Sequence, residues 1–402
     1  MHQSDPQARA TTAGIILAAA ALLTIGVVTV ASASASLDAS IWRAEFWKTT
    51  FGRQAILAVV ALCVLLLVST MGPQWLGWRP KRRLQPVLLL LGATVVCLVL
   101  VLVPGIGLER NGARRWLHLG GTVGFGFQPS EPAKVALVVF LAAYLSGRQR
   151  LLERFFKGVL PAALAVGVCV ALIGPEDFGT AALLAAVGGL ILLIGGVRFW
   201  HLLYLAIPAL AAFAGLLMAK PYRLKRLTAF MDIWADPQGV GYHPVQSLIT
   251  LASGGWFGRG LGGGVQKYGY LPESRTDFIF AVWCEETGLL GALVVLLLFG
   301  TLLILGLRAV WAARTTFERL LAAGVTLLVT LQALLNIAVV TVWAPTTGIA
   351  LPLVSAGGSG LVCLGAAIGL LAGVALRGQY DTEPRVAGLS LGGAARVQAR
   401  GS

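Results

Sequence analysis

Stretches of mostly apolar residues, each about as long as a membrane-spanning helix, recur along this chain. A helix needs about 20 such residues to cross the hydrocarbon core of a bilayer. Ten stretches reach or approach that length, near residues 13–34, 54–71, 86–104, 130–146, 158–174, 179–197, 200–219, 278–307, 320–343 and 357–376. The sequence therefore predicts an all-α polytopic membrane protein with about ten transmembrane helices and a large extracytoplasmic loop, residues 220–277, between helices 7 and 8.

The composition indicates the same class of protein. Of 402 residues, 57% are apolar and 12% are charged, whereas a soluble domain carries about 25% charged residues. These figures exclude a soluble globular protein, a disordered chain and a disulfide-rich secreted scaffold. The five cysteines lie inside apolar stretches and form no CxxC pair. We interpret them as packing residues and expect neither disulfides nor a cysteine metal site.

Basic residues outnumber acidic ones, 31 to 17, which gives a net charge of +14. No basic stripe with interleaved aromatic residues is present, so we expect no nucleic-acid partner. Lys and Arg are densest in the short loops that lie inside if the N-terminus is inside. The positive-inside rule then places both termini in the cytoplasm. We predict a membrane domain over residues 1–377 and a disordered cytoplasmic tail over residues 378–402.

The loop over residues 220–277 is basic although the same rule places it outside. It holds four acidic residues and seven basic ones: Lys220, Arg223, Lys225, Arg226, Arg259, Lys267 and Arg275. Long loops escape the positive-inside rule, which is one explanation. A binding site for an anionic, phosphorylated lipid is the other. Composition alone leaves both open.

Glycines recur in two patterns. Residues 258–263 match GxGxxG, but the match lies in an outer loop without a βαβ unit, so we reject a dinucleotide site. The glycine run over residues 254–264 instead favours close approach of the backbone to a ligand or another segment. Gly365, Gly369 and Gly373 fall on one face of the last predicted helix, which indicates close helix packing.

Charged residues near the predicted helices are candidates for chemistry. Glu131 and Lys134 can pair at i and i+3, and we favour a role for them in lining a site. For Glu286 we favour a buried structural carboxyl. Asp277 stands where the basic loop meets the eighth predicted helix. It is explained either as a residue of a helix first turn or as a general base in group transfer, and spacing does not decide between them.

Several sequence blocks stand out together. They are NGARRW (111–116), QPSEPAK (128–134), RLTAF (226–230), GYHPVQSL (241–248), SGGWFGRGLG (253–262), QK (266–267), YLPE (270–273), TDFIF (276–280), EETG (285–288), PTTGIALP (345–352) and SAGGS (355–359). In this order they resemble the SEDS family of FtsW, RodA and SpoVE over roughly residues 13–377. The GLG motif at 260–262 followed by QK at 266–267 is closer to FtsW and SpoVE than to RodA.

The resemblance implies a peptidoglycan glycosyltransferase that polymerises lipid II at the outer face of the cytoplasmic membrane, in septal synthesis during cell division. It implies a class B penicillin-binding protein and other cell-division proteins as partners. The family's catalytic acid corresponds to Asp277. The substrate-binding residues expected from the resemblance are Arg115, Lys134, Lys267, Glu131, Gln128, Arg53, Arg226, Trp116 and Gln266.

Alternatives remain open at this point. A transporter that flips lipid II would also need a basic cavity between helices, and a RodA-like protein would act in elongation and cell shape. A non-catalytic scaffold for the penicillin-binding protein is a third reading. Arg275, Gly264, His243 and Ala356 depart from the family's usual residues, which affects the subfamily more than the chemistry. No cofactor is evident. A divalent cation could assist the departing pyrophosphate, but no ligand cluster demands one.

Overall fold

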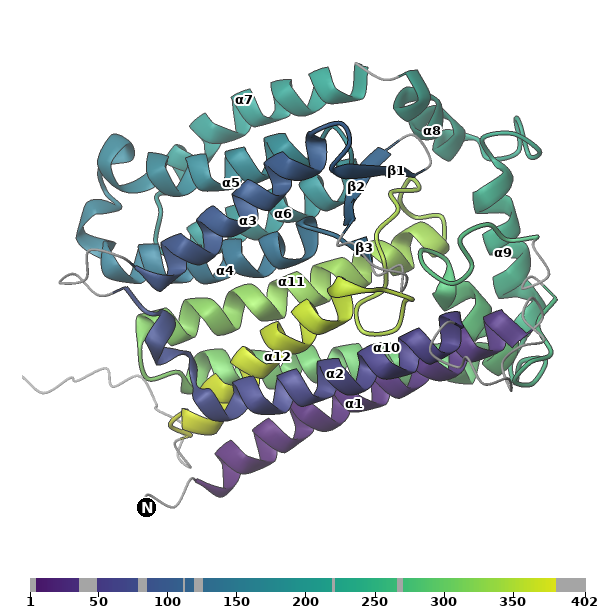
Figure 1. The fold of residues 1–402 in the computed structure, drawn as a ribbon, viewed down its shortest axis with the longest axis horizontal. Helices are drawn as coiled ribbons and strands as arrows, with labels where there is room; N and C mark the ends of the chain where they lie inside the picture. Colours follow the sequence, from purple (N-terminus) through teal and green to yellow (C-terminus); the bar gives the residue numbers. More distant parts are fainter. Residues whose placement is uncertain are drawn as a thin grey trace, which may run out of the picture.

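A computed structural model of the protein describes residues 5–35, 49–78, 85–110, 113–118, 126–218, 221–265 and 270–380 (Figure 1). Most of these residues lie in apolar helices. The helices in the predicted stretches are α1 (Pro6–Ala35), α2 (Thr50–Met71), α3 (Pro86–Leu102), α4 (Ser130–Gly147), α5 (Leu160–Ile173), α6 (Phe178–Ile194), α7 (Phe199–Met218), α10 (Ile279–Ala312), α11 (Thr316–Val340) and α12 (Ser359–Arg377).

Seven helices in the described part of the chain are long and apolar enough to cross a membrane. They are α1, α2, α4, α10, α11, α12 and α5 together with the π-helical turn before it, Phe155–Val159. Three further apolar helices are shorter, namely α3, α6 and the Phe199–Gly215 part of α7. Each predicted stretch coincides with one of these helices, and the helical membrane fold is confirmed. The number of helices that cross the bilayer stays a prediction.

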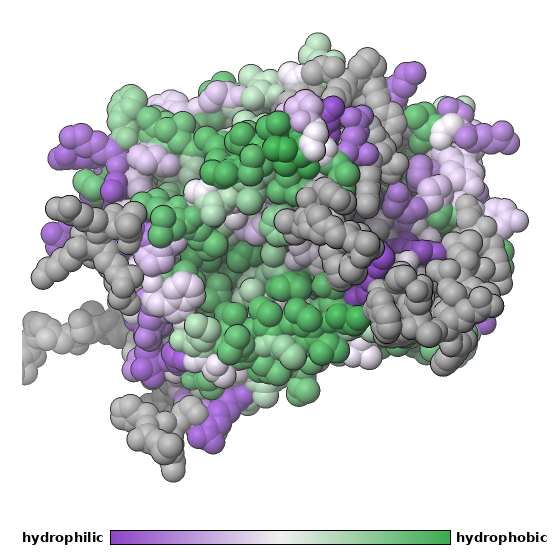
Figure 2. All heavy atoms as spheres, in the orientation of Figure 1, coloured by the Kyte–Doolittle hydropathy of each residue, from purple (hydrophilic) through white to green (hydrophobic). Residues whose placement is uncertain are grey.

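The long apolar helices run side by side along roughly one direction (Figure 1). α4 and α11 pack together in the middle, α3, α5 and α6 lie on one side of them, and α1, α2, α10 and α12 on the other. Figure 2 shows hydrophobic side chains over the flank of this bundle and hydrophilic ones toward its ends. Leu67 on α2 and Leu89 on α3 are among the exposed apolar residues. Such a flank is suited to contact with lipid.

The small-residue face of α12 packs directly on the backbone of α2. A Cβ atom added at Gly365 would lie 2.6 Å from the carbonyl oxygen of Ala61, and one at Gly369 would lie 2.6 Å from that of Leu65. Any side chain at these positions would therefore force the two helices apart. The close helix packing predicted from the glycine spacing is confirmed.

The glycine run over residues 254–264 packs against a break in α10. Gly288 interrupts that helix with φ 68° and ψ −164°. The N–H of Arg259 donates to the carbonyl oxygen of Glu285 at 3.0 Å, and the N–H of Leu289 donates to that of Gly255 at 3.0 Å. A Cβ atom at Gly258 would lie 2.1 Å from the carbonyl oxygen of Glu286. The run thus brings its backbone close to another segment, as the sequence predicts.

Two features of the ends were not anticipated. A small antiparallel sheet lies between α3 and α4, with the order β1 (Gly107–Arg110), β2 (Ala113–His118) and β3 (Gly126–Phe127). The expected long loop contains two helices, α8 (Pro221–Met231) and α9 (Tyr242–Gly254). In Figure 1 they lie at the same end of the bundle as the sheet, and α9 packs against α10.

Candidate active site

Most of the candidate residues lie around the segment that joins α11 to α12, residues 341–358. Buried polar side chains of the helices hold its backbone. Gln332 of α11 donates to the carbonyl oxygen of Ala350 at 3.0 Å, and Gln54 of α2 donates to that of Ser355 at 3.3 Å. The hydroxyl of Ser355 donates to the carbonyl oxygen of Thr276 at 2.6 Å. This α11–α12 connection is therefore fixed to α2, to α11 and to the residues just before α10.

Asp277 lies at that junction and is half-buried. The N-cap of α10 is Phe278, and no side chain makes a capping hydrogen bond there. Helix capping therefore does not account for Asp277. A Cβ atom at Gly348 of the α11–α12 connection would lie 3.4 Å from Asp277 Oδ2. Because Gly348 has φ 74° and no side chain, the carboxyl group stays uncovered on that side.

The surroundings of Asp277 favour its neutral form. Burial is the main cause that raises the pKa of this carboxyl, to about 7, and the negative charges of Glu273 and Asp177 act in the same direction. The positive charges of Arg115 and Arg226 oppose the increase. A carboxylate with a pKa near the working pH is suited to accept a proton.

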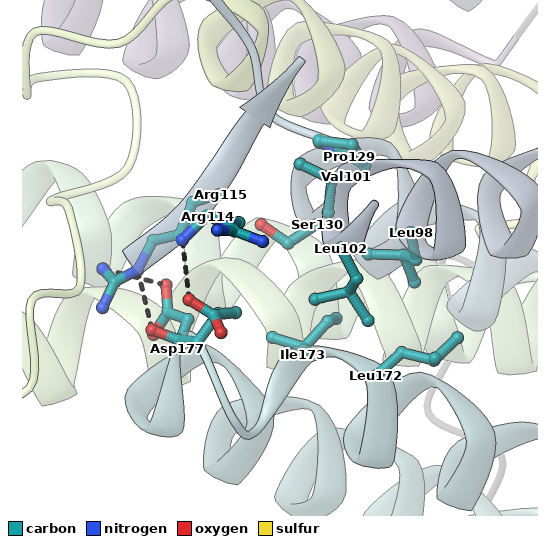
Figure 3. A pocket seen from close by; sticks show the side chains of 11 residues that line it. Leu98, Val101, Leu102, Arg114, Arg115, Pro129, Ser130, Leu172, Ile173 and Asp177 are labelled. Atoms are coloured by element: carbon teal, nitrogen blue, oxygen red, sulfur yellow. Dashed lines mark hydrogen bonds and ion pairs between the residues drawn. The ribbon is translucent and has the colours of Figure 1, made fainter. Parts of the chain in front are cut away.

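Arg115 reaches the same place from strand β2. A Cβ atom at Gly348 would lie 3.8 Å from Arg115 Nη1. The guanidinium also donates from Nε to the carbonyl oxygen of Glu176 at 2.8 Å, and Nη1 lies 3.6 Å from Asp177 Oδ2. Figure 3 shows Arg115 directed at Asp177 at the turn that precedes α6. Because Gly348 has no side chain, the space that its Cβ would fill lies open between Arg115 and Asp277.

Arg226 approaches the connection from α8. Its Nη1 donates to the carbonyl oxygen of Thr346 at 3.1 Å. Nearby, the ring of His243 on α9 stacks on Phe278 with centroids 6.0 Å apart. Burial and the charge of Arg226 lower the pKa of His243, against an opposing effect of Glu273. Two arginines from different elements thus flank Asp277.

Glu131 and Lys134 form the expected pair on α4. Lys134 Nζ lies 2.9 Å from Glu131 Oε1 and donates to Gln332 Oε1 at 2.9 Å, and the residue is 3% exposed. Gln332 in turn holds the carbonyl oxygen of Ala350. The backbone N–H of Gln128 donates to Ser359 Oγ at the start of α12, at 3.0 Å. These residues support the α11–α12 connection from the side of α4.

The remaining candidates lie farther from this geometry or outside it. Arg53 is in the first turn of α2, beside Gln54, whose amide contacts the connection. The indole of Trp116 covers Gly126 of β3, where a Cβ atom would lie 2.6 Å from the ring, so its observed contact is packing within the sheet. Gln266 and Lys267 fall outside the described residues.

A small cleft opens beside Arg115 (Figure 3). Helices α3 and α5 give it an apolar wall that includes Leu98, Leu102 and Leu172. Arg115 and Asp177 lie at its polar end with Arg114 and Glu176. The apolar wall and the charged end meet where β2 contacts the turn before α6.

Several residues of this site were not singled out from the sequence. Asn336 and Gln332 stand four residues apart within an apolar helix, and two amides at that depth are a signal that could have found them. Asp177 directly precedes an apolar helix, a pattern typical of an N-cap. Among the described residues, no group of three or more His, Cys, Asp or Glu side chains is arranged to hold a metal ion.

The fold and this junction define a polytopic membrane protein with a carboxylate between arginines at one end of its helix bundle. Residues 13–380 match the family model for cell cycle proteins of the FtsW, RodA and SpoVE type. The chain belongs to this family. Together with its apolar helices, the relatives below indicate a multi-pass protein of the bacterial membrane.

Relatives of known name cover nearly the whole chain. The stage V sporulation protein E of Bacillus subtilis (strain 168) is 36% identical over 364 residues, which are 89% of this chain and 95% of that protein. A probable peptidoglycan glycosyltransferase FtsW of Geobacter sp. (strain M18) is 40% identical over 365 residues, 90% of this chain and 96% of that one.

Solved structures agree in fold. A chain from a peptidoglycan synthase complex, described as coordinating polymerization and crosslinking, matches with a TM-score of 0.71 and 29% identity, over 93% of this chain and 98% of that one. The rod shape determining protein RodA of Thermus thermophilus matches with a TM-score of 0.64 and 27% identity, over 94% and 99% of the two chains.

Proposed function

We propose that this protein is a peptidoglycan glycosyltransferase that polymerises lipid II. Relatives named as probable peptidoglycan glycosyltransferases at 39–41% identity support this activity. The observation that carries the proposal is the position of Asp277, which lies beside Gly348 and in the electrostatic field of Arg115 and Arg226. A base and cationic groups in one place are what transfer from a pyrophosphate requires.

Lipid II is a disaccharide-peptide linked to undecaprenyl pyrophosphate, and the reaction joins two such molecules. In the proposed step, the acceptor sugar hydroxyl loses its proton to the carboxylate of Asp277. The oxygen bonds to the anomeric carbon of the donor sugar as the bond from that carbon to the pyrophosphate oxygen breaks. The electron pair of that bond leaves with undecaprenyl pyrophosphate, and the glycan is one disaccharide longer.

The departing pyrophosphate needs positive charge near it. We assign the main share to Arg115 and Arg226, because each combines closeness to Asp277 with a guanidinium that can bind phosphate oxygens. Lys134 already contacts Glu131 and Gln332. We therefore assign it, with Glu131 and Gln128, to shaping the floor of the site. Arg53, Trp116, Gln266 and Lys267 stay as proposed substrate contacts.

We propose that the site faces the outside of the cytoplasmic membrane and that both termini are cytoplasmic. The density of Lys and Arg in the short inner loops supports this orientation. We further propose a class B penicillin-binding protein and other cell-division proteins as partners. The similar chain in a peptidoglycan synthase complex supports the first of these partners. The names of the FtsW relatives favour septal synthesis.

A divalent cation that assists the departing pyrophosphate stays part of the proposal, because Mg²⁺ in such sites is bound by one or two carboxylates together with substrate phosphates. Addition of EDTA to an active preparation tests this part. Loss of polymerisation that Mg²⁺ restores would support the cation, and unchanged polymerisation would exclude it.

The activity is tested with purified protein, alone and with its penicillin-binding partner, and with labelled lipid II in detergent or nanodiscs. Glycan polymer formed without a membrane gradient supports the proposal. Movement of labelled lipid II across liposomes without any polymer would instead favour a transporter. A fluorescent fusion distinguishes the cellular roles, because midcell signal is expected for septal synthesis and lateral-wall patches for elongation.

A further inference from the structure

Three contacts fix strand β2 to the turn that precedes α6. Arg115 Nε donates to the carbonyl oxygen of Glu176 at 2.8 Å, and Arg115 Nη1 lies 3.6 Å from Asp177 Oδ2. The backbone N–H of Arg114 donates to Glu176 Oε2 at 2.6 Å. In Figure 3 the side chains of Arg115 and Asp177 point toward each other beside the cleft. The position of the Arg115 guanidinium is thus set by this turn.

Asp177 is itself held rigidly. It is 3% exposed, it forms the N-cap of α6, and its Oδ1 accepts a hydrogen bond from the backbone N–H of Thr180 at 3.0 Å. One carboxylate oxygen therefore serves the helix and the other faces Arg115. The N-cap role alone would be met equally well by Asn. The negative charge of Asp177 is not needed for capping, but it is needed for the ion pair with Arg115.

The nitrogen of Arg115 that pairs with Asp177 also lies near the candidate base. Arg115 Nη1 and Asp277 Oδ2 both lie within 4 Å of the point where a Cβ atom at Gly348 would stand. The guanidinium thus pairs with the buried carboxylate that is fixed to α6, and its charge also acts on the half-buried carboxyl of Asp277. An arginine paired with Asp277 alone would favour the ionised carboxylate more strongly and make it a weaker base.

The charged groups that act on Asp277 come from four elements. Glu273 lies on its own segment, Arg226 on α8, Arg115 on β2 and Asp177 at the start of α6. His243 on α9 stacks on the adjacent Phe278. Glu273 and Asp177 raise the pKa of Asp277, and the two arginines lower it. Of the two acids, only Asp177 also contacts one of those arginines in the described structure.

We propose that Asp177 is a positioning residue for glycosyl transfer, because its carboxylate holds the Arg115 guanidinium beside Asp277 and keeps it from pairing with Asp277 alone. The proposal rests on the proposed function, in which Asp277 accepts the proton and Arg115 binds pyrophosphate. Arg115 is then available to the substrate, and Asp277 keeps enough basicity to take the proton of the acceptor hydroxyl.

The test compares pH–rate profiles of lipid II polymerisation for the wild type, Asp177→Asn and Asp177→Glu. Asp177→Asn keeps the helix cap but removes the charge. We expect its acid limb to move to lower pH, because one charge that raises the pKa of Asp277 is gone. We also expect kcat/KM to fall by about 10- to 100-fold, since the Arg115 guanidinium loses its ion pair and keeps only the hydrogen bond to the carbonyl oxygen of Glu176. Asp177→Glu keeps the charge, so its limb should stay in place while its rate falls.

Glu176→Gln is the matched control. It removes a charge from the same turn, its amide oxygen can still accept from the Arg114 N–H, and Glu176 is not among the charges that shift the pKa of Asp277. Its acid limb should match the wild type. An unmoved limb in Asp177→Asn, equal shifts in both neutral variants, or a wild-type rate in Asp177→Glu would overturn the proposal. An inactive wild type would instead count against the proposed function.

Discussion

The side-chain amide of Asn336 joins Asp277 to the α11–α12 connection. Its Nδ2 atom donates to the carbonyl oxygen of Asp277 at 2.8 Å and to that of Ile349 at 2.7 Å, and the residue is 1% exposed. One buried amide on α11 thus fixes the backbone on both sides of the candidate site. The location of the Asp277 carboxyl follows from this contact and not from a helix cap.

Replacement of Asn336 by Leu should loosen this junction. The side chains have a similar size, but the change leaves two buried carbonyl oxygens without their donor, at a cost of about 1–3 kcal/mol each. We expect a lower thermal unfolding temperature in detergent and a loss of polymerisation. Thr301→Val is the control, because Thr301 is exposed and bonds only within its own helix, to Leu297. An unchanged unfolding temperature for Asn336→Leu would contradict the assigned role.

Polymerisation should depend on pH through Asp277. The carboxyl must be ionised to accept a proton, and its pKa is about 7. We expect the rate to be half-maximal near pH 7 and to fall about tenfold for each unit below it. A rate that stays constant down to pH 5 under substrate-limited conditions would show that another group is the base.

The same pKa predicts a cost in stability. Because the folded-state pKa lies above the ordinary value of about 3.9, the folded protein binds this proton more tightly than the unfolded chain. The free energy of unfolding should then decrease between about pH 4 and pH 7 and level off above. In Asp277→Asn this contribution is absent. Its unfolding temperature should exceed that of the wild type more at pH 8 than at pH 5, where equal differences would contradict the pKa.

The buried pair on α4 should respond differently to single and double changes. Lys134→Met leaves Glu131 without its cation and Gln332 without its donor, which we expect to destabilise the protein by roughly 3 kcal/mol. The double variant Glu131→Gln with Lys134→Met removes both charges and should recover part of that loss. Thermal unfolding of the three proteins measures the difference. A double variant that is less stable than the single one would contradict this account of the pair.

The orientation in the membrane has a direct check. A reporter fused after Arg377 should be cytoplasmic, and one inserted near Gln238, in the turn between α8 and α9, should be outside. If both sites report the same side, the number of crossing helices is wrong, and the assignment of the site to the outer face fails with it.

Local patterns in the sequence predict much of this fold. The apolar stretches correspond to helices because the residues of each helix face either the core of the bundle or lipid, so they are apolar along its whole length. The spacing of Gly365 and Gly369 predicts the contact with α2, and the spacing of Glu131 and Lys134 predicts their ion pair. In each case the periodicity of one helix determines which residues share a face.

Contacts between segments that are distant in the sequence could not be predicted from it. Arg115 and Asp177 are 62 positions apart, and they meet only because β2 folds onto the turn before α6. The sheet itself consists of short strands with little alternation, so its pattern is weak. The role of Gly348 depends on three segments that converge at the end of the bundle. The position of Asp277 beside the basic loop made it a candidate base, the resemblance favoured that role, and only the structure shows that it is not a helix cap.

The most direct measurement of the central claim compares polymerisation by the wild type and Asp277→Asn with purified protein, partner and lipid II. Asn keeps the size of the side chain and removes the charge that a general base needs. We predict a rate lower by about two to four orders of magnitude, with partner binding retained and an unfolding temperature no lower than that of the wild type. Glycan polymer of normal length and rate from a stably folded Asp277→Asn protein would contradict the account.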